Sequence, residues 1–303
     1  VLEKRLGFRV VEYGQRQVFE RIPGHPILTG TNAERLRDWR GEATTVPPRL
    51  AFELRPQHGP TVKWCDIPVS RVWRCGTRGS VASVLIEKPA RGDFLPILDG
   101  GFSLQYAPLM ECREGKGVIL LCQLDVTGRS KADPAAAVLA ANLLKYAADW
   151  KPVPAMSTVY VGESAGRKHL QSLGLNPGKY TSGDLAPDQL LIAGPGVSGQ
   201  AHPTAAVVGK FLAAGGRVLA NALDQPDADA LLPFKVTLTK VEHIGSFFDP
   251  TSMDIPFAGI GPADVHNRVP REMPLLSGGA TILGDGVLGY VPDARIHRPQ
   301  ILF

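Results

Sequence analysis

Four carboxylates in the first half of the chain carry the side chain that acid–base cleavage of a glycosidic bond requires. They are Glu42, Glu87, Asp93 and Asp99. Such cleavage uses two carboxyl groups that flank the bond at a fixed separation. Sequence positions do not define that separation, and ion pairing with Arg40, Lys88 or Arg91 explains the same residues. We therefore expect no catalytic pair among them.

Two short segments combine a tryptophan with arginines, which suits the apolar face and the hydroxyl groups of a sugar ring. The candidate carbohydrate or interface contacts are Arg37, Trp39, Arg40, Glu42, Trp73, Arg74 and Arg78. Stacked arginines can also cover a tryptophan face inside an interface. We favour packing in an interface and keep a carbohydrate-binding surface as the alternative.

The cysteines and histidines lack the spacing of a metal or redox site. No C-x-x-C pair occurs among Cys65, Cys75, Cys112 and Cys122, although a Cys65–Cys75 disulfide across a hairpin stays open. No histidine pair has zinc-ligand spacing. The glycine-rich turn at residues 194–199 precedes a predicted helix and could present amides to an anion, but Pro195 removes one donor. We expect no metal and no cofactor.

The composition is that of a globular chain long enough for two domains. It has 303 residues, of which 44% are hydrophobic and 20% charged. No apolar run reaches the roughly 18 residues of a membrane span. The formal charge of +4 is too small for a nucleic-acid stripe. We expect neither a membrane nor a nucleic acid as a partner.

A buried strand followed by a helix is predicted at residues 117–150. The apolar run at 118–122 is typical of a strand buried on both faces of a parallel sheet. Asp133 is suited to cap a helix that has Pro134 in its first turn. Apolar residues then recur on one helical face: Leu139, Leu143, Tyr146 and Trp150. Upstream, residues 60–98 alternate short β-rich runs with turns, which indicates a small antiparallel insertion or an extension of the sheet.

Two domains are expected, residues 1–150 and 151–303, divided at the proline-stiffened connector 151–154. Beyond the connector, strands and helices alternate. Strands are expected at residues 158–161, 189–193, 217–221 and 234–238, and helices at residues 164–173, 203–214 and 226–232. This alternation is typical of an open, mostly parallel sheet.

An internal repeat relates the two domains. Segments match in the same order: residues 2–10 with 229–236, 25–30 with 254–259, and 117–122 with 298–303. The first domain would then be the back half of one α/β unit, and the second domain a similar unit truncated at its C-terminus. The match predicts that residue 303 lies on an interior strand with an unfilled place beside it. Chance similarity is the alternative.

The second domain resembles the class I glutamine amidotransferases in two blocks. Residues 188–196 resemble the strand and glycine-rich turn that supply backbone donors for an oxyanion, and residues 216–225 are similar to the nucleophile elbow. The family's cysteine falls on Ala222, which has no thiol to add to a carbonyl. The strand that matches the family's His-x-Glu pair lies in the first domain, where the two positions are Gln123 and Asp125. The resemblance implies two flavodoxin-like open parallel-sheet units, an α/β fold, without the chemistry.

A second resemblance spans most of the chain. Residues 38–42, 89–101 and 122–128 are similar to the C-terminal region of large bacterial glycoside hydrolases of the family 2, or β-galactosidase, type. This implies an accessory or oligomerisation region whose partners are the catalytic domain of the same polypeptide, a second copy of the chain, and oligosaccharide. It also implies an extracytoplasmic location, which the residues themselves leave open. Two other functions stay open: a hydrolase with a site between the units, and a carbohydrate-binding module.

Overall fold

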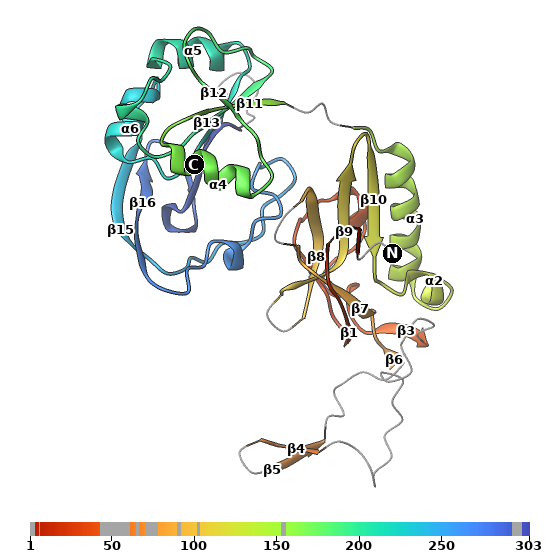
Figure 1. Ribbon diagram of the computed structural model, residues 1–303. Helices are drawn as coiled ribbons and strands as arrows, with labels where there is room; N and C mark the ends of the chain where they lie inside the picture. Colours follow the sequence, from red (N-terminus) through yellow and green to blue (C-terminus); the bar gives the residue numbers. More distant parts are fainter. Residues whose placement is uncertain are drawn as a thin grey trace. The chain divides into compact units, whose positions relative to one another are not determined.

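The structure is a computed structural model of the chain, and it describes residues 4–5, 7–42, 61–64, 67–70, 78–89, 92–101, 104–152, 156–292 and 299–303. It is a mixed α/β protein with several sheets, one of which contains parallel strands, and with few helices (Figure 1). The chain divides into two compact units. The first unit comprises residues 1–152 and 250–253, and the second comprises residues 153–249 and 254–303.

A six-stranded sheet forms the centre of the first unit. Its strands are β1 (Val10–Gln15), β2 (Phe19–Glu20), β7 (Ala82–Glu87), β8 (Phe94–Gly100), β9 (Tyr106–Glu114) and β10 (Gly117–Cys122). Their order is β1-β7-β9-β8-β2, and β10 pairs with β9. Every pairing among the described strands of this unit is antiparallel. The predicted open parallel sheet is therefore wrong for this unit.

Strand β10 shows why that prediction failed. Gly115, with φ at 61°, lies in the short turn between β9 and β10. A connection this short joins antiparallel strands, because a parallel pair needs a long crossover. The register runs from Gly117 opposite Glu114 to Cys122 opposite Leu109. The apolar run also lies less deep than expected, since only Leu121 among its residues is fully buried. An apolar run indicates burial but not the direction of the partner strand.

The predicted β insertion at residues 60–98 is only partly separate from this sheet. Strands β4 (Thr61–Trp64) and β5 (Ile67–Ser70) form an antiparallel hairpin of their own. A second short pair consists of β3 (Trp39–Glu42) and β6 (Arg78–Gly79). However, β7 and β8 belong to the main sheet and are among its most buried strands. Strands β7 and β8 therefore form the sheet extension that the sequence also allowed, and the two short pairs are separate from the main sheet.

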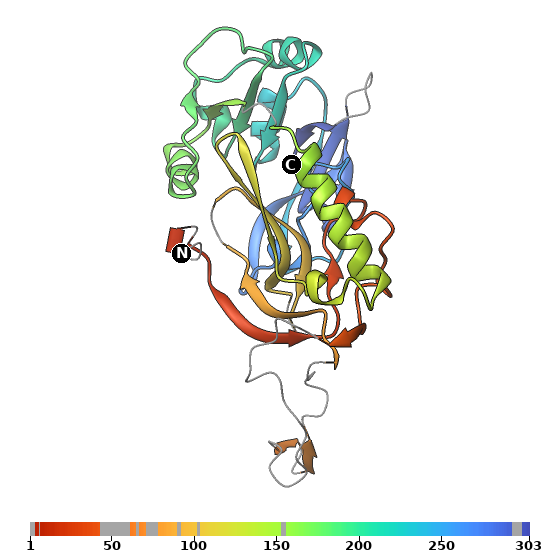
Figure 2. The ribbon, with the colours of Figure 1, turned by 90° about the vertical axis from the view of Figure 1, so that its right-hand side faces the viewer.

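Helix α3 (Pro134–Asp149) packs on one face of this sheet, as both views show (Figures 1 and 2). The Asp133 side chain caps the helix by accepting from the amide of Ala135 at 2.8 Å, which confirms the predicted start. Leu139 is fully buried and packs in one cluster with Leu85 and Leu109 of the sheet. The short helix α2 (Val126–Arg129) precedes α3.

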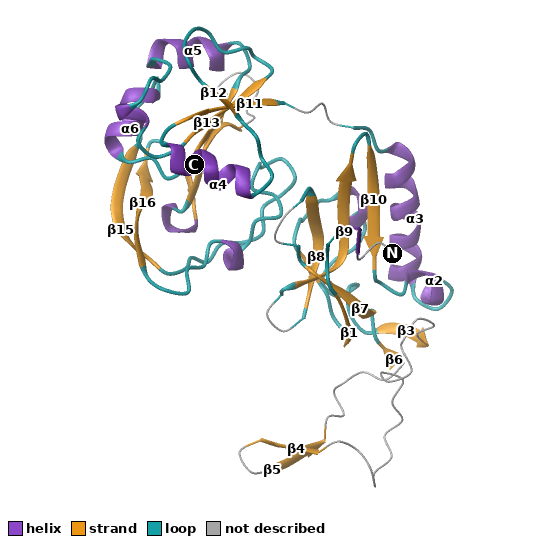
Figure 3. Cartoon of the chain, viewed as in Figure 1, coloured by secondary structure: helices purple, strands orange, loops and turns teal. Residues whose placement is uncertain are grey.

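The second unit contains the parallel strands (Figure 3). They are β11 (Ser157–Val161), β12 (Gly178–Lys179), β13 (Gln189–Ala193), β14 (Arg217–Ala220) and β19 (Pro299–Leu302). Their order is β12-β11-β13-β14-β19, and each neighbouring pair is parallel. Strands β18 (Leu288–Pro292) and β17 (Thr281–Leu283) continue the sheet antiparallel. Helices α4 (Ser164–Ser172), α5 (Ala205–Ala213) and α6 (Gln225–Leu231) interrupt the strands. The predicted alternation is confirmed here through β14, but the strand expected at residues 234–238 is wrong: β15 (Thr237–His243) begins later and pairs antiparallel with β16 (Arg271–Gly278) in a separate two-stranded sheet.

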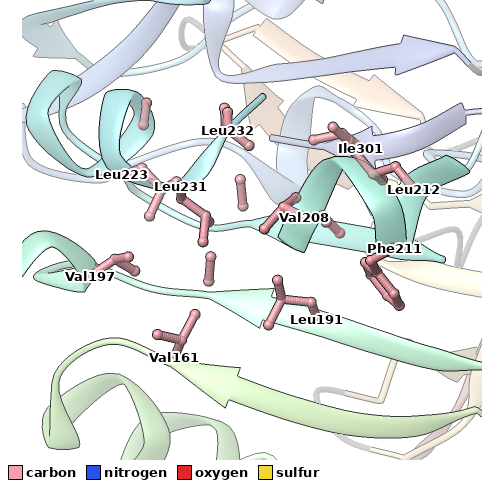
Figure 4. Close-up of a cluster of buried hydrophobic side chains, with 14 of the residues drawn as sticks. Val161, Leu191, Val197, Val208, Phe211, Leu212, Leu223, Leu231, Leu232 and Ile301 are labelled. Carbon is pink, nitrogen blue, oxygen red and sulfur yellow. The ribbon is translucent and has the colours of Figure 1, made fainter. Parts of the chain in front are cut away.

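The core of this unit lies between the sheet and its helices. Leu191 of β13 and Val218 of β14 are fully buried against Val208 of α5 and Leu231 of α6, and Figure 4 shows this cluster. Burying one such side chain stabilises the fold by about 1.5–3 kcal/mol. Strand β19 lies between β14 and β18, so it is an interior strand, and Phe303 directly follows it. Both sides of β19 are paired, so the predicted unfilled place beside it is wrong.

The two units share an antiparallel arrangement. In the first unit β1 pairs with β7, and β9 pairs with both β8 and β10. In the second unit β15 (Thr237–His243) pairs with β16 (Arg271–Gly278), and β18 pairs with both β17 and β19. The matched segments 117–122 and 298–303 include β10 (Gly117–Cys122) and β19 (Pro299–Leu302), the last strand of each set. The units differ in two ways. Strand β7 also pairs with β9, whereas β15 and β16 form a sheet of their own, and β19 also pairs with β14, whereas no described strand occupies that edge of β10.

Candidate functional site at the carboxyl edge of the parallel sheet

The order of the parallel strands reverses at β11. Strand β12 lies on one side of β11, and β13, which follows β12 in the chain, lies on the other. In open α/β sheets, ligands bind in the crevice outside the carboxyl ends of the strands at such a point. This edge carries residues 162–164 after β11, residues 194–199 after β13 and residues 221–224 after β14. It is therefore the candidate functional site of the second unit.

Three glycines at this edge surround the side chain of Tyr160. A Cβ atom on Gly162, Gly166 or Gly194 would lie 2.8, 2.1 or 2.3 Å from the Tyr160 hydroxyl oxygen. The ring is 3% exposed, and its hydroxyl donates to the carbonyl oxygen of Glu163 at 3.0 Å. Burial, and then the charge of Glu163, raise the pKa of Tyr160. The chain's own neutral aromatic side chain therefore fills space at the reversal point.

The glycine-rich turn after β13 donates its amides to a carboxylate of the chain. The amide of Gly196 donates to Oδ2 of Asp227, and the amide of Ser198 donates to Oδ1, each at 2.8 Å. Asp227 lies in the first turn of α6 and is 2% exposed. Burial raises the pKa of this carboxyl, but the hydrogen bonds from Ser198, Gly196 and Asp224 together bring it below its usual value. Asp227 is therefore ionised at neutral pH and occupies these amides.

Ala222 lies in the turn between β14 and α6. Its φ is 54°, in the left-handed region that an L-residue enters at a cost of about 1–2 kcal/mol. Its methyl group is exposed. Two residues later, Asp224 caps α6 by accepting from the amide of Asp227 at 2.9 Å. The position matched to a nucleophile thus has a sharp turn and no nucleophilic atom.

Comparisons with known proteins add no relative whose site could be mapped onto this edge. No family model, curated protein or solved structure matches the chain. Among the described residues, no group of histidine, cysteine, aspartate and glutamate side chains is arranged to hold a metal ion. No helix in the described part of the chain is both long and apolar enough to cross a membrane.

In the first unit, Trp39 is a core residue. It is 1% exposed, and its indole Nε1 donates to the carbonyl oxygen of Arg35 at 2.8 Å. A ring this buried offers no face to a sugar, which corrects the carbohydrate contact considered for Trp39. Arg37 and Arg40 are exposed. Trp73 and Arg74 lie outside the described residues, as do the side chains of Glu42 and Arg78.

The buried side chain of Arg129 connects the Trp39 segment to the rest of the unit through hydrogen bonds. It is fully buried, and Nη1 donates to the carbonyl oxygens of Trp39, Arg40 and Gly41 at 2.8, 3.1 and 2.7 Å. Its Nε lies 3.3 Å from Oδ2 of Asp125. Asp125, placed by resemblance at a catalytic position, is therefore the ion-pair partner of a structural arginine. The four-residue spacing of this pair was the available sequence signal.

Gln123 has a backbone role in the same region. Its backbone amide donates to the carbonyl oxygen of Pro108 at 2.8 Å, which continues the pairing of β10 with β9.

Two of the four candidate acid–base carboxylates, Asp99 and Glu87, form ion pairs. Asp99 lies 3.2 Å from Arg21 and 2.7 Å from Lys88, and Glu87 lies 3.4 Å from Arg9.

A buried polar cluster in the first unit was missed by sequence reasoning. Glu111 of β9 is fully buried, and its Oε2 accepts from the hydroxyl of Tyr146 at 2.8 Å. Arg113 lies 3.0 Å from the other carboxylate oxygen. The ring of fully buried His25 lies 4.9 Å from the ring of Tyr146. Residues on β9, on α3 and before β3 form this cluster, so no local spacing could have revealed it.

Proposed function

We propose that the chain is a non-catalytic accessory or oligomerisation region of a bacterial glycoside hydrolase that acts on carbohydrate. The proposed fold of the second unit is flavodoxin-like, of the class I glutamine amidotransferase type, and the first unit is an incomplete copy that retains only the antiparallel part of this fold. The strand order β12-β11-β13-β14-β19 supports this for the second unit, because it is the 2-1-3-4-5 order of flavodoxin-like sheets. The shared antiparallel arrangement of the two units supports the tandem.

The contact of Asp227 with the turn after β13 is the main support for the proposal that the chain is not catalytic. Acyl transfer needs a nucleophile and free donors for the oxyanion that forms. Here Ala222 supplies only a methyl group, while the amides of Gly196 and Ser198 already donate to a buried carboxylate. An oxyanion at the same amides would meet the negative charge of Asp227, which opposes its formation.

The test of this proposal is an activity assay on the purified chain. We expect no release of nitrophenol from aryl glycosides and no release of ammonia from glutamine above the rate in buffer. Turnover of either substrate would favour instead a hydrolase with a site of its own. Sedimentation equilibrium tests the oligomerisation role, for which we expect self-association at micromolar concentration; a monomer throughout would leave only the accessory role.

The carbohydrate-binding alternative is tested by tryptophan fluorescence. All four tryptophans lie within residues 1–152, so the signal reports the first unit alone. Because Trp39 is buried, we expect no shift with oligosaccharides. A saturable shift that persists in Trp39→Phe would instead support a binding surface elsewhere in the first unit.

A further inference from the structure

A pocket of about 210 Å³ opens in the second unit beside the ends of β11 and β12 and the start of α4. Its polar lining consists of Ser164, Arg167, Lys179 and Gln200, and its aromatic lining of Tyr160 and Tyr180. The lining contains two cations and no carboxylate. The volume lies below the roughly 300–1,000 Å³ of pockets for drug-sized ligands. The pocket therefore suits a small, negatively charged group.

The two cations have no counter-charge within the described chain. Neither Arg167 nor Lys179 forms an ion pair there, and Nε of Arg167 is buried without a hydrogen-bond partner. A buried guanidinium N–H that donates to nothing costs about 1–3 kcal/mol or more. Such an unsatisfied donor at the wall of a pocket is available to a bound ligand or water molecule that can accept from it.

Some of the other polar groups around the pocket already form hydrogen bonds within the chain, and others are available to a ligand. The Tyr180 hydroxyl donates to the carbonyl oxygen of Gly183 at 2.8 Å, and the Tyr160 hydroxyl is engaged as described above. The two rings therefore act as apolar walls. Glu163 precedes α4 but makes no capping hydrogen bond, which leaves the first amides of this nine-residue helix without a side-chain acceptor.

The nearest carboxylate points away from the pocket. A Cβ atom on Gly196 would lie 2.5 Å from Cγ of Glu163, so this side chain lies over the turn after β13. Glu163 is not among the lining residues. Its charge is therefore directed at a different part of the carboxyl edge from the pair Arg167 and Lys179.

We propose that this pocket binds a phosphate group, either free or as a monoester of a small molecule. The planar guanidinium of Arg167 matches two phosphate oxygens, and the ammonium of Lys179 adds a point charge. The hydroxyl of Ser164 and the first amides of α4 supply neutral donors. This inference goes beyond the proposed function and does not depend on it.

The test uses the full chain labelled with ¹⁵N and titrated with sodium phosphate at pH 7, with sodium chloride adjusted to hold the ionic strength constant. We expect saturable shifts of the amides of Ser164, Arg167 and Tyr180. The dissociation constant should rise at least tenfold in Arg167→Gln and in Lys179→Gln. It should be unchanged in Lys168→Gln, which removes an exposed cation from the same helix outside the pocket. Lys179 is exposed on a short strand, so its variant tests the pocket even where Arg167→Gln fails to fold.

Two further titrations define the ligand. In the first titration, glycerol phosphate replaces inorganic phosphate. Tighter binding of the ester identifies a monoester as the ligand. Tighter binding of inorganic phosphate identifies the free anion. Acetate replaces phosphate in the second, and we expect at least tenfold weaker binding. Shifts that do not saturate, equal binding of acetate, or equal loss of binding in Lys168→Gln would each overturn the proposal.

Discussion

Asp227 accepts a hydrogen bond from the amide of Gly196 at 2.8 Å and thereby joins the start of α6 to the turn after β13. Gly196 has φ at 75°, a conformation that glycine adopts without strain and that lets the following amides converge. A converging turn of this kind is usually an anion site for a ligand. In this chain the anion is a side chain, so the same geometry stabilises the fold.

Replacing Asp227 by asparagine should destabilise the second unit. Asp227→Asn keeps one acceptor oxygen but removes the charge that strengthens two hydrogen bonds, so we expect a loss of about 1–3 kcal/mol in the free energy of opening. Hydrogen exchange of peptides covering β13, followed by mass spectrometry, measures it. Asp188→Asn, an exposed residue before β13, should change nothing. Because the pKa of Asp227 is lowered, its contribution is present above the usual carboxyl pKa and is lost as the pH falls through the lowered value.

Ala222→Gly should stabilise the second unit. Glycine removes the cost of about 1–2 kcal/mol for φ at 54°, but its greater freedom in the unfolded chain costs about 0.5–1 kcal/mol, which leaves a net gain of up to about 1.5 kcal/mol. Ala214→Gly is the matched control, because Ala214 is exposed and has φ at −84°. That change should only destabilise. Hydrogen exchange of the β14 peptides distinguishes the two, and equal effects would mean that the turn is not strained.

The second unit could be predicted from the sequence because its signals are local. Proline and threonine or aspartate caps mark the starts of α5 and α6, and short apolar runs mark β13 and β14. Each crossover between parallel strands leaves a helix in the sequence, so the alternation itself indicates the pairing direction. Where no helix separates two strands, these signals do not indicate the direction in which the strands pair.

The first unit lacked such signals, and its parallel sheet was predicted from the single run at residues 118–122. Direction there depends on the short turn before β10, whose residues Gly115 and Lys116 are unremarkable in composition. The polar groups that matter most, Arg129 and Glu111, meet partners up to 90 positions away. Long-range contacts of this kind leave no period in the sequence. In the second unit, Ala222 was placed correctly in a turn before α6, but the carboxylate that engages the glycine-rich turn was not foreseen.

Arg129→Ala should strongly destabilise the first unit. The change removes the donor to three carbonyl oxygens and the ion pair with Asp125 from a fully buried position, which we expect to cost about 3–5 kcal/mol. Urea denaturation followed by tryptophan fluorescence measures this, since all tryptophans lie in residues 1–152. Arg129→Lys keeps the charge but loses the planar guanidinium, so its free energy of unfolding should lie between those of Arg129→Ala and the unchanged chain. Arg37→Ala removes an exposed arginine and should lie within experimental error of the unchanged chain.

His25 should make the first unit less stable in mild acid. Its Nδ1 accepts from the amide of Ile27 at 3.2 Å, so the neutral ring carries its proton on the buried Nε2. Burial lowers the pKa of His25, and the nearby Glu111 only partly opposes this. The unfolded chain therefore binds more protons than the folded chain once the pH falls toward the ordinary value of about 6.5, and stability decreases as the pH falls further toward the lowered pKa. Urea midpoints by tryptophan fluorescence at pH 7.5, 6.5 and 5.5 should show this slope. His25→Asn retains an acceptor for the Ile27 amide and should flatten it, whereas His169→Asn, on an exposed face of α4, should not. An undiminished slope in His25→Asn would assign the effect to another group.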